Sequence, residues 1–427
     1  MSNLKIPTEL VAPVFNPATF GNRDKVHEIF TALRRDYPLS IAEVPGYEPH
    51  WIVTKYADLR EISRQDNLFH GGDRSKTLIS LAGEALVKQY TGGQSNIWRS
   101  LVQLDPPEHT QYRSVLAPTF MPDQILKLKD GVKDTAQEYV DRMAKLGGAC
   151  DFATDIAFRF PLKVVLDLVG VPAQDHEIML ELTQWLFSYA DPDLKRPGSD
   201  LSDPQEITRT WDIVFKRFQD YYAPIVADRR KNPRNDLASL IANGKVFGGP
   251  MEERAMVSYF AIISTAGHDT TSATTAMGMW LLAEQPALLQ RLKDNPGLIA
   301  GFVEESIRWT SPVQQFVRSA VDDYELRGRT IRKGDLLYLS YVSANRDEEV
   351  FENPFLFDPA RAPNRHIGFG YGAHICLGQH LARLEMKALW EALIPRLESV
   401  EMSGPGRMTE SEFVSGPKSV PIRFRMH

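Results

Sequence analysis

Residues 369–379 read FGYGAHICLGQ, and the interpretation of the whole chain starts from this stretch. It is rich in glycine, holds one of only two cysteines, and leads directly into a helical pattern over residues 379–393, which Pro395 ends. Cys376 is therefore expected at or just before a helix N-terminus, where unpaired N–H groups and partial positive charge favour a thiolate. A thiolate held in this way suits either a soft metal ligand or a nucleophile.

The composition is that of an ordinary globular protein, with 427 residues, 43% hydrophobic and 24% charged. A net charge of −6 argues against nucleic acid as the main partner, because no basic field attracts phosphates. The two cysteines give no disulfide framework, which fits a reducing compartment. The N-terminal sequence lacks a signal-peptide pattern, and no apolar stretch of about 20 residues occurs. We therefore expect no membrane anchor and a cytoplasmic location.

Hydrophobic periodicity predicts a mainly α fold with small antiparallel β-sheets. Helices are expected over residues 22–36, 125–143, 156–169, 177–189, 206–230, 252–283 and 379–393. Strands are expected in a hairpin within residues 41–56, in residues 324–341 and at residues 420–424. Nothing in the pattern resembles a β-α-β alternation.

Two connecting segments are unusual. Residues 67–96 have a loop-like composition with much apolar content, so they either cover a ligand site or form a surface loop that buries its own hydrophobic side chains. Residues 191–204 contain three prolines and are expected to form a long mobile connection.

The longest helical pattern, residues 252–283, is weakened at its centre. The centre reads Ala266-Gly267-His268-Asp269-Thr270-Thr271, although Gly, Asp and Thr are poor residues for a helix interior. A helix that is apolar on most faces must cross the interior of the protein. Violations of local rules at such a place are expected at functional sites.

Three interpretations of the cysteine stretch are open. Residues 368–373 loosely fit a dinucleotide-binding fingerprint, but the required β-α-β context and acidic residue are missing. A Cys376–His374 dyad of a hydrolase would need the two side chains to meet within a tight loop, and no third orienting group is evident. The third interpretation is haem iron held by the Cys376 thiolate, with glycines that let the backbone approach the macrocycle.

Four motifs, in order, make the chain similar to the cytochrome P450 family. The stretch Phe369-Gly370-x-Gly372-x-His374-x-Cys376-x-Gly378 resembles the haem-ligand loop of that family, and residues 266–271 resemble the oxygen-binding motif of its long central helix. Residues 305–308 (Glu-Ser-Ile-Arg) resemble its Glu-x-x-Arg pair. Residues 357–361 resemble the later segment that supplies a third, arginine member.

The resemblance implies the fold and the cofactor. The chain would form one cytochrome P450 domain over residues 1–427, an α-rich triangular prism with haem b (heme b) between the central helix and the cysteine-loop helix. Its β-containing lobe would lie mainly in residues 37–66 and 318–345, with the C-terminal strands added. Cys376 would be the axial iron ligand.

The resemblance also implies roles for other side chains. Asp269 and Thr270 would deliver protons during oxygen activation, while Glu305, Arg308 and Arg361 would form a structural network. Further haem contacts would come from Ala266, Gly267, Phe369, Gly370 and Gly378. Cations for the haem propionates would be His109, Arg113, Arg318 and His374.

The implied activity is a monooxygenase that hydroxylates a small hydrophobic substrate with O2. Similarity to soluble bacterial members implies electrons from a two-iron ferredoxin and its flavin reductase, a monomeric state, and docking at a basic patch of Arg113, Arg383 and Lys387. Peroxide-dependent peroxygenase, fatty-acid hydroxylase and non-enzymatic haem carrier are the alternatives, and the Asp269-Thr270 pair argues against a peroxygenase and against a carrier.

Several segments are most similar to the bacterial terpineol hydroxylases within this family, among them residues 265–272, 343–351, 363–370 and 378–387. A monoterpene or an alkyl-substituted or fused aromatic hydrocarbon is therefore expected as substrate. Its pocket would be lined by Leu78, Leu81, Trp185, Phe187, Ile262, Ile263, Ala266, Val313, Phe316, Val317, Phe413 and Val414.

Overall fold

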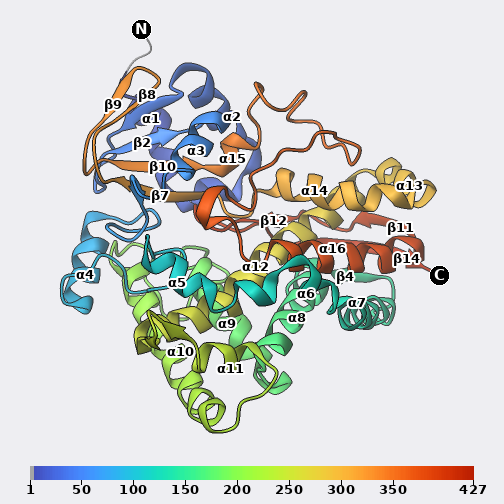
Figure 1. Cartoon of the computed structure of the whole chain (residues 1–427). Coiled ribbons are helices and arrows are strands. Elements are labelled where there is room, and N and C mark those ends of the chain that lie inside the picture. Colours follow the sequence, from blue (N-terminus) through green and yellow to red (C-terminus); the bar gives the residue numbers. More distant parts are fainter. Residues whose placement is uncertain (1–3) are drawn as a thin grey trace.

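A mixed β-sheet forms the upper part of the molecule (Figure 1). The computed structural model describes residues 4–427, and in this part of the chain the sheet has five strands in the order β1-β2-β10-β7-β3. The hairpin expected within residues 41–56 is confirmed, because β1 and β2 pair antiparallel. The strands are β1 (Leu39–Ala42), β2 (His50–Val53), β10 (Leu336–Ser340), β7 (Gln315–Ala320) and β3 (Phe69–His70).

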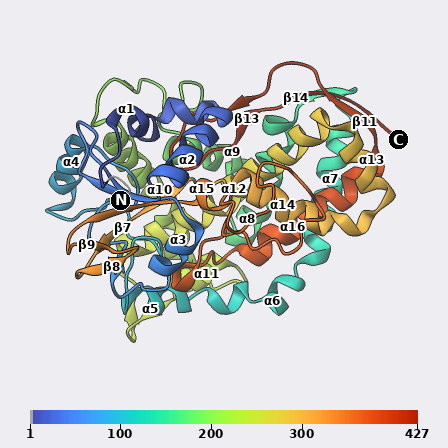
Figure 2. The same ribbon diagram turned by 90° about the horizontal axis from the view of Figure 1, so that it is seen from above.

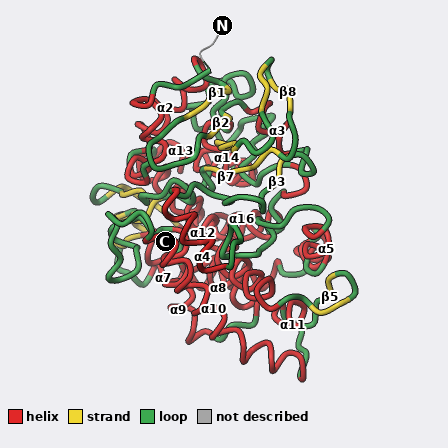
Figure 3. Tube along the Cα trace, turned by 90° about the vertical axis from the view of Figure 1, so that its left-hand side faces the viewer, coloured by secondary structure: helices red, strands yellow, loops and turns green. Residues whose placement is uncertain are grey.

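The rest of the molecule is mainly helical, and the strands of the five-stranded sheet gather at one end (Figure 3). Against the sheet lie α1 (Thr8–Val11), α2 (Arg23–Asp36), α3 (Tyr56–Ser63) and α15 (Tyr341–Ala344). The others are α4 (Leu81–Thr91), α5 (Glu108–Ser114), α6 (Pro122–Leu126), α7 (Lys129–Ala144), α8 (Arg159–Val169), α9 (His176–Phe187), α10 (Glu206–Lys231), α11 (Leu237–Ala242), α12 (Glu253–Glu284), α13 (Pro286–Asp294), α14 (Ile299–Thr310) and α16 (Gln379–Leu393).

Side chains of the central strand β10 alternate between two hydrophobic cores. Leu336 and Tyr338 belong to a core that includes residues of α2, whereas Leu337 and Leu339 belong to a core that includes residues of α3. This alternation follows from the two-residue period of a strand. Both faces of the sheet are therefore covered, which makes the sheet a rigid support for β7.

One strand pair departs from the expected antiparallel pattern. β10 runs parallel to β2, with Leu337 opposite Trp51. The two strands lie far apart in the sequence, and their alternation of apolar residues carries no information about direction. The smaller sheets are antiparallel: β11 (Leu397–Met402), β14 (Pro421–Met426) and β4 (Ala149–Asp151) form one, and the pairs are β12 (Arg407–Met408) with β13 (Pro417–Ser419), β5 (Lys245–Val246) with β6 (Gly249–Pro250), and β8 (Tyr324–Leu326) with β9 (Arg329–Ile331).

The long helix α12 runs through the middle of the helical part, as its apolar sequence predicts. It contacts α8, α10, α14 and α16, and the view from above places α14 and α16 beside it in the centre of the molecule (Figure 2). It is buried on nearly all faces over Ala255–Ala283. Its position brings residues 266–271 to the interior of the protein.

Two predictions about local structure were wrong in detail. Residues 67–96 contain the helix α4, which the Ser80 hydroxyl caps by accepting a hydrogen bond from Gly83 N–H, and which ends at Gly92 in a left-handed conformation. The flanking glycines hid the helix-forming run between them. The helix expected over residues 125–143 is broken into α6 and α7.

The connection over residues 191–204 contains no helix or strand, as expected, and it is fixed at its start. Asp191 is fully buried and pairs with Lys418, at 2.8 Å between carboxylate oxygen and Nζ. The mobility expected for the rest of the connection stays a prediction. No helix within residues 4–427 has the length and apolar character that crossing a membrane requires.

Candidate functional site

Residues 369–378 form a tight loop immediately before α16. Cys376 N–H donates to the carbonyl oxygen of Phe369 at 2.8 Å, which closes the loop. Gly370 and Gly372 have positive φ angles of 76° and 75°, and a Cβ on Gly372 would clash with the carbonyl oxygen of Ser63 at the end of α3. These contacts fix the position of the cysteine.

The sulfur of Cys376 faces inward. The side chain of Cys376 is exposed although protein atoms surround the residue, so its accessible side is turned to the interior. Burial raises the pKa of this thiol, and a hydrogen bond from Gly378 N–H and the charges of Arg113 and Arg383 oppose that rise. Arg113 also donates to the carbonyl oxygen of Ile375 at 2.8 Å. Such a thiol ionises readily only when it binds a cation such as a metal.

A buried network of ion pairs supports the chain that leads into the cysteine loop. Arg308 and Glu305 are completely buried and make a two-pronged pair at 2.7 and 2.8 Å, and Arg361 donates to the same carboxylate at 3.1 Å. Arg308 also donates to the carbonyl oxygen of Asn345, whose side chain accepts from Ile367 N–H at 2.8 Å. The structure therefore brings the three predicted network residues together and connects them to the chain just before the cysteine loop.

In the middle of α12, the threonine hydroxyl groups donate hydrogen bonds to backbone carbonyl oxygens one turn earlier in the same helix. Thr270 Oγ1 donates to the carbonyl oxygen of Ala266 at 3.2 Å, and Thr271 Oγ1 donates to that of Gly267 at 3.4 Å. A Cβ on Gly267 would lie 2.9 Å from a methyl group of Val165 in α8. The glycine therefore allows α8 to pack closely on α12. Its predicted contact with a cofactor stays a prediction.

Asp269 lies next to Thr270 and faces a small polar cavity. Burial raises the pKa of this carboxyl to about 7, and no charged group among the described residues offsets the effect of burial. The carboxyl therefore changes its protonation state near neutral pH. The polar residues that line the cavity with it are Gln184, Ser188, Thr409 and Ser415.

Four predicted cationic residues gather near the cysteine loop. The rings of His109 and His374 lie 4.0 Å apart between centroids, and Nε2 of each is buried without a hydrogen-bond partner, as is Nη1 of Arg318. Burial, and after it the charge of Arg113, lowers the pKa of His109 to about 4. Burial, and after it the charge of Arg318, lowers the pKa of His374 to about 2. Buried donors without acceptors point to an anionic group that these residues are built to hold.

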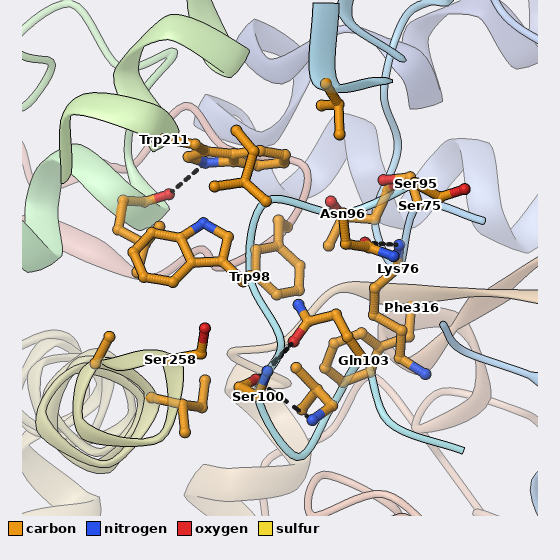
Figure 4. A pocket seen from close by; sticks show the side chains of 18 of the residues that line it. Ser75, Lys76, Ser95, Asn96, Trp98, Ser100, Gln103, Trp211, Ser258 and Phe316 are labelled. Atoms are coloured by element: carbon orange, nitrogen blue, oxygen red, sulfur yellow. Dashed lines mark hydrogen bonds between the residues drawn. The ribbon is translucent and has the colours of Figure 1, made fainter. Parts of the chain in front are cut away.

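A larger cavity, lined mainly by aromatic and aliphatic side chains, adjoins α12 (Figure 4). Its lining includes Ile262, which lies one helical turn before Ala266 and so shares a face of α12 with it. Phe187, Phe316 and Phe413 line it as well, so four of the predicted pocket residues surround one cavity.

Other predicted pocket residues lie elsewhere. Leu81 is 46% exposed at the start of α4, so its prediction as a pocket residue was wrong. Val317 and Leu78 are buried in the core beside α2, because strand alternation turns Val317 away from the cavity that Phe316 faces. Trp185 lies in the helical core, beneath the guanidinium of Arg217.

The last group of predicted pocket residues does not line the large cavity either. Ile263 and Ala266 are partly buried on α12, and Val313 forms a β-bridge with Val414. Val414 lines the small cavity beside Asp269 instead.

Sequence reasoning missed several residues of the large cavity. Trp98 and Trp211 face it from distant segments, and Lys76, Asn96 and Gln103 add polar groups at one end (Figure 4). Trp98, Asn96 and Gln103 lie in irregular segments without periodicity, and Trp211 belongs to a half-buried face of α10. No local signal in the sequence could have found them.

The residues of the site fit a metal cofactor that carries acidic groups. Cys376 offers one inward sulfur ligand, and the unpaired nitrogens of His109, His374 and Arg318 offer donors for carboxylates. A Cβ on Gly378 would meet no atom within 4 Å, so there is open space beside the cysteine, and the apolar cavity lies beside α12. Haem with an axial thiolate meets all of these conditions.

Comparisons with known proteins agree with this geometry. The family model "Cytochrome P450" matches residues 7–296 and 297–424. Cytochrome P450-terp of a Pseudomonas species is 43% identical over 98% of this chain and 98% of its own length. Linalool 8-monooxygenase of Pseudomonas putida is 29% identical over 93% of this chain and 95% of its own length.

A solved structure shows the same fold. The crystal structure of a cytochrome P450 from Novosphingobium aromaticivorans has a TM-score of 0.90 and 38% sequence identity, and the match covers 100% of both chains. The fold, the inward cysteine and the sequence relatives lead to one conclusion. The chain belongs to the cytochrome P450 family of haem-thiolate monooxygenases.

Proposed function

We propose that the enzyme hydroxylates a small, largely hydrophobic molecule, such as a monoterpene or an alkyl-substituted or fused aromatic hydrocarbon. The observation that carries this proposal is the aromatic cavity beside α12, lined by Trp98, Trp211, Phe316 and Phe413. The names of two relatives, cytochrome P450-terp and linalool 8-monooxygenase, support a terpene as substrate.

The protein and the cofactor have separate tasks. Bound haem supplies the activation of O2 and the oxidation of a C–H bond. The chain binds the cofactor through Cys376 and the cationic residues around His109 and His374. The aromatic side chains exclude water from the cavity and orient the substrate against the face of α12 that carries Ile262 and Ala266.

Asp269 and Thr270 are proposed to deliver protons. A group whose pKa lies near 7 can both accept and release a proton at neutral pH, and Asp269 has that property. The Thr270 hydroxyl donates its hydrogen to the carbonyl oxygen of Ala266, so its oxygen lone pairs stay free to accept a hydrogen bond from another group. The pair would pass a proton from the small polar cavity to the reaction site.

Replacing Thr270 by Ala is expected to uncouple the enzyme. We expect reductant to be consumed at a rate close to that of the wild type, while product falls roughly tenfold and peroxide appears instead, in line with the loss of one positioned proton-transfer group. Product and peroxide formed per NAD(P)H consumed would be measured. Thr271→Ala, at the next position of the same helix with the same type of hydrogen bond, should stay coupled; equal coupling in the Thr270 variant and the wild type would contradict the role.

Replacing Asp269 by Asn is expected to slow turnover without weakening substrate binding, and to change the pH dependence of stability. Burial raises the pKa from 3.8 to about 7, so the folded protein binds this proton more tightly than the unfolded chain does. The stability of the wild type should therefore fall relative to Asp269→Asn as pH rises from about 4 to 7, and the difference should stay constant above that range.

Urea unfolding of the two proteins across this pH range measures the difference. A constant difference would mean that the carboxyl is not desolvated. Weaker substrate binding at a normal turnover rate would contradict proton delivery.

A spectroscopic titration of the ferric enzyme tests the substrate class. Monoterpenes, alkylbenzenes and fused aromatics of cavity size are expected to change the haem absorption spectrum with low-micromolar dissociation constants, on the order of 8 kcal/mol of binding free energy. Long-chain fatty acids serve as the contrast. Tight binding of fatty acids together with no response to terpenes would refute the proposal in favour of a fatty-acid hydroxylase.

A two-iron ferredoxin is proposed as the electron donor, docking beside the cysteine loop. The three arginine and lysine residues expected there carry little free charge: Arg383 pairs with Glu304 at 2.7 Å, Lys387 lies 3.7 Å from Glu391, and Arg113 is half-buried. A second basic pair, Arg60 and Arg64 of α3, is a better candidate.

Both arginines lie over Tyr371 of the cysteine loop. Arg60 and Arg64 donate to its hydroxyl at 2.7 and 3.3 Å, and neither forms an ion pair with a described residue. Their positive charge is therefore free to attract an acidic partner.

Replacing Arg64 by Glu is expected to raise the KM for ferredoxin roughly tenfold at low salt, because an exposed charge at a docking surface mainly changes association. Reduction of the haem by a chemical reductant should stay unchanged. Steady-state turnover against ferredoxin concentration would be compared with Arg425→Glu, a reversal of an exposed charge on the distant strand β14. Equal KM values in the two variants would exclude this docking face.

A cytoplasmic location and a monomeric state stay predictions.

A further inference from the structure

Lys76 is a lysine whose charge is buried without a counter-charge, and its Nζ lies 5.2 Å from the centroid of the Phe316 ring. It lies between β3 and α4 with 2% exposure, and its Nζ has no hydrogen-bond partner and forms no ion pair among the described residues. A buried ammonium group without a counter-charge is strongly unfavourable. The position therefore calls for an anion that the chain itself does not supply.

A second buried cation points to the same place. Arg318 of β7 is 5% exposed, and its Nη1 also lacks a partner. A Cβ on Gly71 would clash with Lys76 Nζ and would lie 2.6 Å from Arg318 Nη1. The two cationic nitrogens thus converge on a point beside the bare α-carbon of this glycine.

The two carboxylates of this loop, Asp73 and Asp105, form no ion pair with Lys76 or Arg318. Both oxygens of Asp105 accept hydrogen bonds from the backbone N–H groups of Gly71 and Gly72, each at 2.7 Å. These hydrogen bonds hold the carboxylate at the two backbone N–H groups, and it forms no ion pair with Lys76 or Arg318. Two like charges held this close are stable only around a shared anion, and a carboxylate matches the donors of lysine and arginine.

We propose that Lys76 and Arg318 together bind one carboxylate of the haem, and that the group around His109, Arg113 and His374 binds the other. Haem b carries two propionates, and the structure offers two sets of unpaired buried donors for them. Lys76 is thus a cofactor-binding residue outside the motifs of the sequence. The inference rests on the presence of haem and is independent of the proposed hydroxylation and its substrate.

Lys76 also belongs to the wall of the substrate cavity. Its side chain runs along the edge of the cavity next to Phe316 and Gln103 (Figure 4). Its carbonyl oxygen accepts from Val317 N–H at 2.7 Å, and its N–H donates to the side chain of Asn96. The contact with a propionate would therefore fasten residues 71–103, the segment that covers the cavity, to the edge of the cofactor.

Lys76→Met removes the charge and keeps the length of the side chain. We expect the purified holoenzyme to lose haem to excess apomyoglobin roughly 10- to 100-fold faster, which corresponds to one hydrogen bond to a charged group. The midpoint potential of the haem should become more negative, because a nearby cation favours the reduced state. Lys76→Arg should keep most of the wild-type retention, since it keeps the charge.

Lys88→Met is the matched control. Lys88 lies in the same segment, is about half exposed, and pairs with Glu84 at 2.9 Å, so its loss should leave haem retention and potential unchanged. Circular dichroism of each holoenzyme shows whether the variant keeps its fold, and Lys76→Gln replaces Lys76→Met if the latter does not fold.

Two results would overturn the proposal. Haem loss and midpoint potential equal to those of the wild type in a folded Lys76 variant would show that no propionate is bound there. Unchanged haem retention with a loss of binding limited to carboxylate-bearing ligands, measured against neutral terpenes of the same size, would assign the site to an acidic substrate instead. Loss of haem in both Lys76→Met and Lys88→Met would also refute a specific contact.

Discussion

The buried pair of Glu305 and Arg308 is the interaction on which the site depends. Both charges are removed from water, so each must be satisfied within the protein, and every partner is thereby fixed in position. The partners come from three points of one long connection, residues 345–361: Arg361, the carbonyl oxygen of Pro354, and Asn345, whose side chain in turn accepts from Ile367 N–H. The network fixes the backbone that leads into the cysteine loop, so the direction of the sulfur follows from a constraint on the opposite side of that loop.

The cofactor completes the electrostatics of the interior. Around His374 the chain places several cationic or donor groups and leaves them unpaired, and the accessible thiol of Cys376 lies two residues further along the same loop. Bound haem supplies carboxylates for the donors and a metal cation for the thiolate. Cofactor binding and stability of the fold are therefore linked, since the protein without haem bears the cost of desolvating these groups.

The parts of the site that the sequence predicted are those written in contiguous motifs. The loop around Cys376, the centre of α12 and the Glu305–Arg308 pair each depend on local spacing, and the structure shows the loop, the helix and the pair as expected. The cavity depends on tertiary packing. Phe316 and Val317 are neighbours in one strand, so their side chains point to opposite faces of the sheet and only Phe316 lines the cavity. Leu81 lies in a helix that the sequence pattern did not reveal. Trp98 and Trp211 come together only after folding. The buried charge of Lys76 is invisible in a sequence where lysine is normally a surface residue.

The environment of Asp269, at the centre of α12, sets the pKa of its carboxyl. The residues that line its cavity are neutral, so burial acts on the carboxyl without compensation and its pKa rises to about 7. A lysine or arginine in place of Gln184 or Ser188 would pair with the carboxylate, lower the pKa and keep the group ionised, which would make it a poor proton donor at neutral pH. The absence of a cation from this lining is therefore as important to a proton-delivering role as the carboxyl itself.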